Sequence, residues 1–178
     1  MLFRSSGNGY NSGTATLYQD ITDYATFIAD GGAFSKTSAS GGGTEEGSYA
    51  TLVGLNSATF RSGSVINVIL ITDEDDDSSL TDFNSAEAAL TAKKALFNFI
   101  GVPGTGNTNS RYGVLASNHG GYAFDIYDFR NDPENFFNTF IQYKVQEITE
   151  HNAVPEPASM SLLSLGLLGL AGLKKKRS

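Results

Sequence analysis

An apolar, largely β-branched stretch runs from Val65 to Ile71 and is followed by five consecutive acids, Asp73 to Asp77. Such a stretch is typical of a strand that is buried on both faces, as in a parallel sheet covered by helices. Open α/β sheets bind their ligands at the carboxyl ends of the strands, so the pattern predicts a carboxylate cluster at the edge where binding occurs. The alternative interpretation is an acidic loop that is simply solvated.

The rest of the chain alternates between helical and extended patterns. Apolar residues at helical spacing predict four helices, with Thr44 as the N-cap of the second and Asp132 as that of the last. The predicted helices are 20–29, 45–57, 80–100 and 133–150, and the other predicted strands are 1–4, 112–116 and 121–129. Strands that alternate with helices indicate a layered α/β fold with a mostly parallel sheet.

The chain changes character after residue 152, which divides it into a body, 1–152, and a tail, 153–178. Pro155 and Pro157 cannot continue the preceding helix. The 16 residues from Ala158 to Leu173 are apolar except for serine and glycine. As a helix they would be about 24 Å long, against about 30 Å of bilayer hydrocarbon, which predicts a single short transmembrane helix. The basic cluster that follows would stay on the cytoplasmic side; it comprises Lys174, Lys175, Lys176 and Arg177.

Charge and cysteine content narrow the function classes. The chain has 19 acids and 12 bases, and without the tail it has 18 acids and 8 bases, a net charge of −10. A body this acidic repels nucleic acid and suits cations or basic partners. There is no cysteine, which excludes disulfides, thiolate metal sites and cysteine nucleophiles. His119 lies among small polar residues, where we expect it to be exposed.

The tail resembles a known sorting signal. Val154, Pro155, Glu156 and Pro157, then a short apolar segment, then a basic terminus, are similar to the PEP-CTERM signal. The resemblance implies export from a Gram-negative bacterium that produces exopolysaccharide. It also implies membrane anchoring by the tail, until a membrane-embedded exosortase processes it, and a location in the cell envelope or extracellular matrix. An N-terminal signal peptide is implied too, but the first residues lack the pattern of one.

The body resembles part of a von Willebrand factor type A domain, in the segments Gly41 to Leu52 and Asn67 to Asp77. The resemblance implies a three-layer, Rossmann-like sheet with helices on both faces, here lacking the family's first strand and helix. It also implies a metal-ion-dependent adhesion site, for which Thr44 and Asp73 match two ligands. Such a site takes Mg²⁺, or Ca²⁺ or Mn²⁺, through oxygen ligands. The family's Asp-x-Ser-x-Ser motif is absent, so we expect weak binding of a divalent ion.

These observations favour a non-enzymatic adhesion or interaction protein whose ligand is a protein or an exopolysaccharide. Thr44 has the alternative role of a plain helix cap, and Glu74 to Asp77 are expected to be solvated. An EF-hand-like loop starting at Asp73 fails, because Ser78 stands where glycine is required and Asn84 where glutamate is required. Two further hypotheses stay open: a secreted hydrolase that uses the acids as general acid and base, and an inactive gene fragment.

Overall fold

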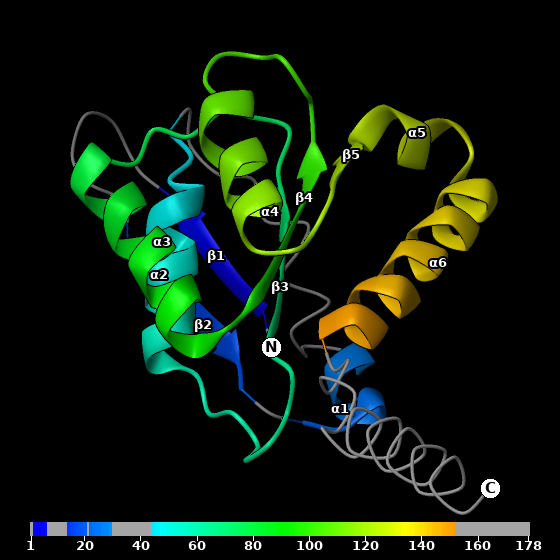
Figure 1. Ribbon diagram of the computed structural model, residues 1–178, viewed down its shortest axis with the longest axis horizontal. Coiled ribbons are helices and arrows are strands. Elements are labelled where there is room, and N and C mark those ends of the chain that lie inside the picture. Colours follow the sequence, from blue (N-terminus) through cyan, green and yellow to red (C-terminus); the bar gives the residue numbers. More distant parts are fainter. Residues whose placement is uncertain (1, 7–13, 21, 30–43, 152–178) are drawn as a thin grey trace, which may run out of the picture.

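A three-stranded parallel sheet forms the centre of the computed structural model, which describes residues 2–6, 14–20, 22–29 and 44–151 (Figure 1). Its strands are β3 (Asn67–Ile71), β4 (Leu96–Gly101) and β5 (Ala123–Asp125), in the order β3-β4-β5. Asn67 pairs with Leu96 and Ile71 with Ile100. The carboxyl ends of the three strands therefore lie along one edge of the sheet.

Helices cover both faces of this sheet. One face packs against α2 (Gly47–Ser57), α3 (Leu80–Lys93), a π-helical turn, η2 (Asn109–Gly113), and α4 (Val114–Asn118). The other face packs against α5 (Ile126–Asn131) and α6 (Pro133–His151). Because side chains alternate along a strand, β4 directs Phe97 and Phe99 into the first layer and Ile100 into the second. The predicted α/β fold with a parallel sheet and flanking helices is confirmed.

A separate antiparallel hairpin begins the described chain. It consists of β1 (Leu2–Ser6) and β2 (Thr14–Gln19), and it lies against α2 rather than joining the parallel sheet (Figure 1). The sequence predicted a strand near β1 but none at β2. The first predicted helix is present only as α1 (Tyr24–Ile28), where the Asp23 carboxylate caps the backbone N–H of Thr26 at 2.8 Å.

Strand β3 is not the doubly buried strand that its composition predicts. Within the described residues only β4 pairs with it, and Ile69 and Ile71 are 43% and 62% exposed. Val68 and Leu70 do face the core. On the other face, α6 reaches β3 through a hydrogen bond from Lys144 to Asn67, and its aromatic residues pack on β5 instead. The strand that is buried on both faces is β4, every residue of which is buried.

The predicted helix over 80–100 is confirmed over 80–93 and wrong after residue 93. Helix α3 ends at Lys93, Lys94 takes a left-handed conformation with φ of 50°, and β4 follows. The predicted strand over 112–116 is instead η2 and α4, because Tyr112, Leu115 and Ala116 share one buried helical face. The predicted strand over 121–129 is shorter, since Asp125 caps α5 by accepting from the Tyr127 N–H at 2.8 Å.

The last predicted helix is confirmed as α6, and the Asp132 carboxylate accepts from the Asn135 N–H at 3.1 Å, as expected of its cap. In the described part of the chain, no helix is long and apolar enough to span a membrane. The predicted transmembrane helix falls in 158–173, outside the described residues.

Candidate functional site

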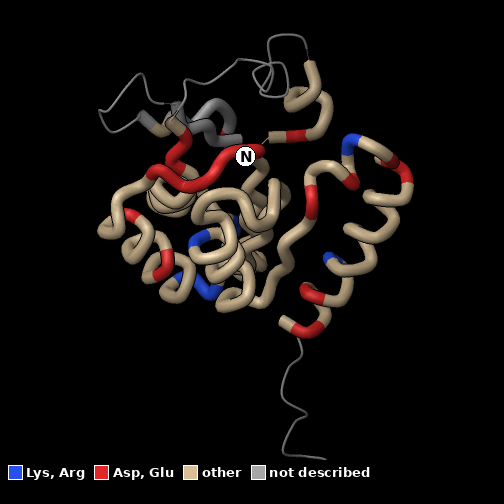
Figure 2. The backbone as a smooth tube through the Cα atoms, turned by 90° about the horizontal axis from the view of Figure 1, so that it is seen from above, with Lys and Arg blue, Asp and Glu red and all other residues tan. Residues whose placement is uncertain are grey.

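The acids Asp73 to Asp77 lie in the loop that follows β3, which we call the acid loop (Thr72–Ser78). Figure 2 shows an uninterrupted acidic stretch of the chain, and its place after β3 puts it at the carboxyl edge of the sheet. The loop after β4 and the start of α2 are hydrogen-bonded to it. The predicted carboxylate cluster is therefore at the predicted edge, but its members have different surroundings.

Asp76 is buried and serves as an anchor. Its carboxylate accepts from the Ser48 hydroxyl at 2.5 Å and from the Ser78 hydroxyl at 2.6 Å, and the backbone N–H groups of both serines lie at 3.2 Å. The Arg111 guanidinium is 3.8 Å away. A buried carboxylate needs such compensation. Asp76 therefore fixes the acid loop to the first turn of α2, and the expectation that it is solvated is wrong.

The loop after β4 holds the acid loop from the other side. The side chain of Asn107 accepts from the Asp76 N–H and donates to the Asp76 carbonyl, both at 2.8 Å. The Asn107 N–H also donates to the Asp75 carboxylate at 3.3 Å. Gly106 has φ of +48°, and a Cβ there would lie 2.1 Å from Asp75 Oδ2. This close approach requires glycine, so the two loops are fitted to each other.

The entry to α2 is joined to the acid loop by two hydrogen bonds between Glu45 and Asp77. The Glu45 N–H donates to the Asp77 carboxylate at 3.0 Å, and the Asp77 N–H donates to the Glu45 carbonyl at 2.9 Å. The Thr72 hydroxyl donates to the Glu45 carboxylate. Helix α2 begins at Gly47 with Glu46 at its N-cap position, so the prediction of Thr44 as the N-cap is wrong.

Asp73 is exposed and forms an ion pair with a side chain of α5. Its Oδ2 lies 2.8 Å from a guanidinium nitrogen of Arg130 in α5, and the two side chains are 52% and 47% exposed. The hydrogen bond from Arg130 lowers the pKa of the Asp73 carboxyl below its usual range. The Tyr127 ring, also exposed, stands 5.7 Å from the same guanidinium. A charged and aromatic patch thus lies beside the acid loop.

Tyr112 supports the site from beneath. Its hydroxyl accepts from the Gly47 N–H at 3.2 Å and approaches the Asp75 carbonyl at 3.4 Å. Burial, reinforced by the charge of Asp76, raises the pKa of this phenol above its usual range. Tyr112 therefore stays protonated, and its hydroxyl group links α2 to the acid loop by hydrogen bonds.

The two predicted metal ligands, Thr44 and Asp73, are each next in sequence to a residue of the hydrogen-bonded pair Thr72 and Glu45. Thr44 precedes Glu45 and Asp73 follows Thr72, and the Thr72–Glu45 hydrogen bond brings both to the same edge of the sheet. A hard divalent cation needs about six oxygen ligands. Among the described residues there is no group of three or more His, Cys, Asp or Glu side chains that could hold an ion, and Arg130 occupies the Asp73 carboxylate. This donor set does not fit a divalent ion on its own.

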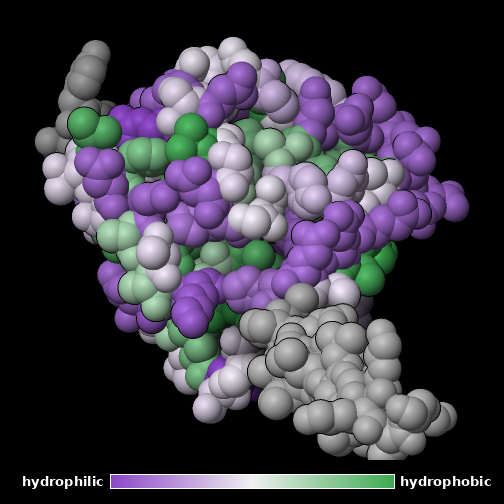
Figure 3. All heavy atoms as spheres, in the orientation of Figure 1, coloured by the Kyte–Doolittle hydropathy of each residue, from purple (hydrophilic) through white to green (hydrophobic). Residues whose placement is uncertain are grey.

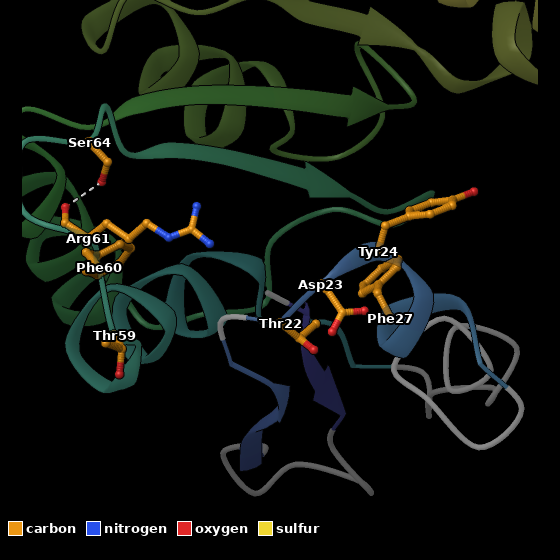
Figure 4. A pocket seen from close by; sticks show the side chains of 8 residues that line it. All are labelled: Thr22, Asp23, Tyr24, Phe27, Thr59, Phe60, Arg61 and Ser64. Carbon is orange, nitrogen blue, oxygen red and sulfur yellow. Dashed lines mark hydrogen bonds between the residues drawn. The ribbon is translucent and has the colours of Figure 1, made fainter.

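Two other features lie away from the acid loop. A shallow, open hollow of about 390 Å³ lies between α1 and the connection from α2 to β3, where Tyr24, Phe27 and Phe60 line it (Figure 4). His119, expected to be exposed, is instead nearly buried, with Nε2 at 3.0 Å from a carboxylate oxygen of Glu87.

The residues that build this site were mostly missed at the level of sequence. Ser48, Ser78 and Asn107 carry no motif, and only their places next to the predicted helix and strand ends could have pointed to them. The link between Arg130 and Asp73, 57 positions apart in the chain, has no local signal.

Comparison with known proteins identifies the tail only. Residues 153–177 match the model of the PEP-CTERM protein-sorting motif, which covers the predicted motif from Val154 to Pro157 and the basic cluster. No curated protein and no solved structure matches the chain. The motif marks an exported protein that is sorted to the cell surface and processed by exosortase.

Proposed function

We propose that this protein is an exported adhesion or interaction protein of the cell surface or matrix, and that it binds its partner at the carboxyl edge of the sheet. The observation that carries the proposal is the exposed patch of Asp73, Arg130 and Tyr127 beside a firmly held loop. Binding residues are commonly placed on loops that a rigid scaffold positions. Arginine and tyrosine are also the residue types that most often anchor interfaces.

A von Willebrand A-type body is part of the same proposal. It is supported by the parallel sheet with helices on both faces and by the positions of Thr44 and Asp73 at one edge. The proposed partner binding does not depend on a metal ion, because the described donors are too few. We expect Mg²⁺ binding weaker than about 1 mM, the weak end of the range for extracellular calcium modules.

The geometry favours binding over hydrolysis. A general acid that works near neutral pH needs a raised pKa, whereas Arg130 lowers the pKa of Asp73. Asp76 is buried and already accepts from two serines, so a polymer could not reach it. Asp75 accepts from the Asn107 N–H. These acids are arranged to hold the loops in place and, in the case of Asp73, to pair with the guanidinium of Arg130.

The test measures binding of the full chain to exopolysaccharide purified from the producing bacterium, by surface plasmon resonance in mild detergent. Arg130→Ala should weaken binding at least about tenfold, since an anchoring arginine contributes roughly 1.4 kcal/mol or more. Arg61→Ala is the matched control, because Arg61 is exposed at the opposite end of β3; it should change affinity less than twofold.

Three results would overturn the proposal. Equal losses in the two arginine variants would place binding elsewhere. Release of reducing ends from the polymer that disappears with Asp73→Asn and Asp75→Asn would establish the hydrolase instead. An absence of binding both to the polymer and to surface protein extracts of the same bacterium would favour the inactive fragment.

A further inference from the structure

Helix α6 has a second apolar side that the sheet does not cover. Its inner side packs Phe136 and Phe140 into the core below β5. Its outer side carries Phe137, Ile141 and Val145, which are 49%, 56% and 60% exposed. We call these three residues the outer stripe. In Figure 3 a small group of hydrophobic residues is visible on the right of the molecule among mostly hydrophilic ones.

The spacing of the outer stripe suits another helix. Residues four apart lie on one face of a helix, and a row of them forms the seam along which a second helix packs. A contiguous exposed apolar surface is a common feature of interaction sites.

The tail of the same chain has the right length and position. Helix α6 has 19 residues and ends at His151, and the apolar segment from Ala158 to Leu173 has 16. As helices the two would measure about 28 Å and about 24 Å. The connection, 152–157, has six residues, which is within the usual range of about two to eight for antiparallel helix neighbours.

The charges agree with the same arrangement. An antiparallel tail would bring the basic cluster, Lys174 to Arg177, to the start of α6. The exposed acids there are Asp128, Asp132 and Glu134. Figure 2 shows acidic positions gathered around the turn between α5 and α6, where Arg130 is already paired with Asp73. Opposite charges would therefore meet at the end of the apolar seam.

We propose that the apolar tail segment folds back as an antiparallel helix on the outer stripe of α6, and leaves it when it enters the membrane. This contact shields the segment from water before sorting. It also makes the body a competitor of the membrane for the tail, so that release of the tail depends on bilayer or exosortase binding. The inference does not rest on the proposed adhesion function.

Cysteine cross-linking of the full chain tests this arrangement, because the chain has no cysteine of its own. Val145 and Ser164 are equally far from the middle of the connection, so they should face each other. The variant Val145→Cys with Ser164→Cys should form an intrachain disulfide at least about tenfold faster than Gln146→Cys with Ser164→Cys. Gln146 is the matched control, since it is also exposed but a helical step of about 100° turns it away from the seam.

Two further measurements complete the test. Vesicles of phosphatidylcholine and phosphatidylglycerol should slow the Val145–Ser164 reaction by taking up the tail. Replacing Lys174, Lys175 and Lys176 together with glutamate should also slow it severalfold. Equal rates in the two cysteine pairs would overturn the proposal. So would disulfides that form only between chains, which would assign the outer stripe to a second copy, and so would a reaction that requires vesicles.

Discussion

Removal of the Asp76 carboxylate is the sharpest test of how the candidate site is built. In Asp76→Ala, the hydroxyl and backbone donors of Ser48 and Ser78 lose their shared acceptor. The Arg111 guanidinium, 3.8 Å away, loses its nearest carboxylate. The substitution therefore releases the acid loop from the start of α2 and leaves polar groups buried without partners.

The expected cost follows from these contacts. A hydrogen bond to a charged group contributes about 1.5–3 kcal/mol, but bonds that share one acceptor do not add fully. The serine hydroxyls can also rotate to other acceptors. We therefore expect Asp76→Ala to lower the free energy of unfolding by about 3–5 kcal/mol, comparable to breaking a buried ion pair. That is a large share of the roughly 5–15 kcal/mol that stabilises a typical domain.

Urea unfolding followed by circular dichroism measures this loss. With a slope of about 2 kcal/mol per molar urea, the midpoint should fall by roughly 2 M. Glu74→Ala is the control, because the Glu74 side chain is exposed in the same loop; it should change stability by less than about 0.5 kcal/mol. A loss below about 1 kcal/mol in Asp76→Ala would refute the reasoning, since the anchor would then be dispensable.

Three other substitutions give distinct outcomes. Arg130→Ala should raise the pKa of Asp73 towards its usual range in a carbon-13 NMR titration; an unchanged pKa would mean that the pair does not form in solution. Pairing lowers the pKa of Asp73 in the folded state, and an exposed pair of this kind stabilises the fold by about 0.2–1 kcal/mol. This stabilisation is present above about pH 4 and is lost as the pH falls through the folded-state pKa of Asp73. Lys144→Ala should lower the free energy of unfolding by about 3 kcal/mol in urea, because it leaves the buried Glu147 carboxylate without its cation. Adding Glu147→Leu should recover most of this loss. If it does not, the loss arises from packing and not from the unpaired carboxylate. Gly121→Ala should lower the free energy of unfolding by about 2 kcal/mol or more, since its Cβ would lie 1.8 Å from the backbone oxygen of Phe97 in β4. An unchanged urea midpoint would mean that the segment before β5 can move away from β4.

The elements that the sequence predicted well have strong local signals. Helix α6 has a capping aspartate, a proline at its first position and a regular apolar period, and all three are visible in the sequence. Strand β3 has a run of β-branched residues, which are enriched in strands. Such signals depend only on residues that are close in sequence, so they can be recognised without knowledge of the fold.

Strand β4 was missed because its signal is ambiguous. The residues of α3 are good helix formers, and Leu96, Phe97 and Ile100 continue their apolar spacing into the strand. Nothing in the composition marks the break at Lys94, which has φ of 50° although it is not glycine. The parallel pairing with β3 decides the conformation, and that is a contact between distant segments. The burial of β3 on both faces was wrongly predicted for the same reason, since edge or centre is a property of the sheet.

The position of the acid loop was predicted, but its contacts were not. The carboxyl end of β3 could be located from the sequence, because the apolar run of the strand stops where the acids begin. The sequence could not show which acid is buried. Asp76 differs from its neighbours only through the serines that face it from α2 and from its own loop. Composition treats the five acids as equivalent, whereas tertiary contacts separate them.

This separation bears directly on where a partner can bind. Asp75, Asp76 and Asp77 each accept hydrogen bonds from the scaffold, and a ligand could recruit them only by breaking those bonds. Asp73 is held by a single exposed arginine, a pair that contributes little to stability and that a charged ligand can replace at little cost. A basic group would compete for Asp73, and an acidic group would compete for Arg130. The firmly bonded acids thus supply rigidity, and in the proposed function the loosely held pair supplies the surface at which a partner binds.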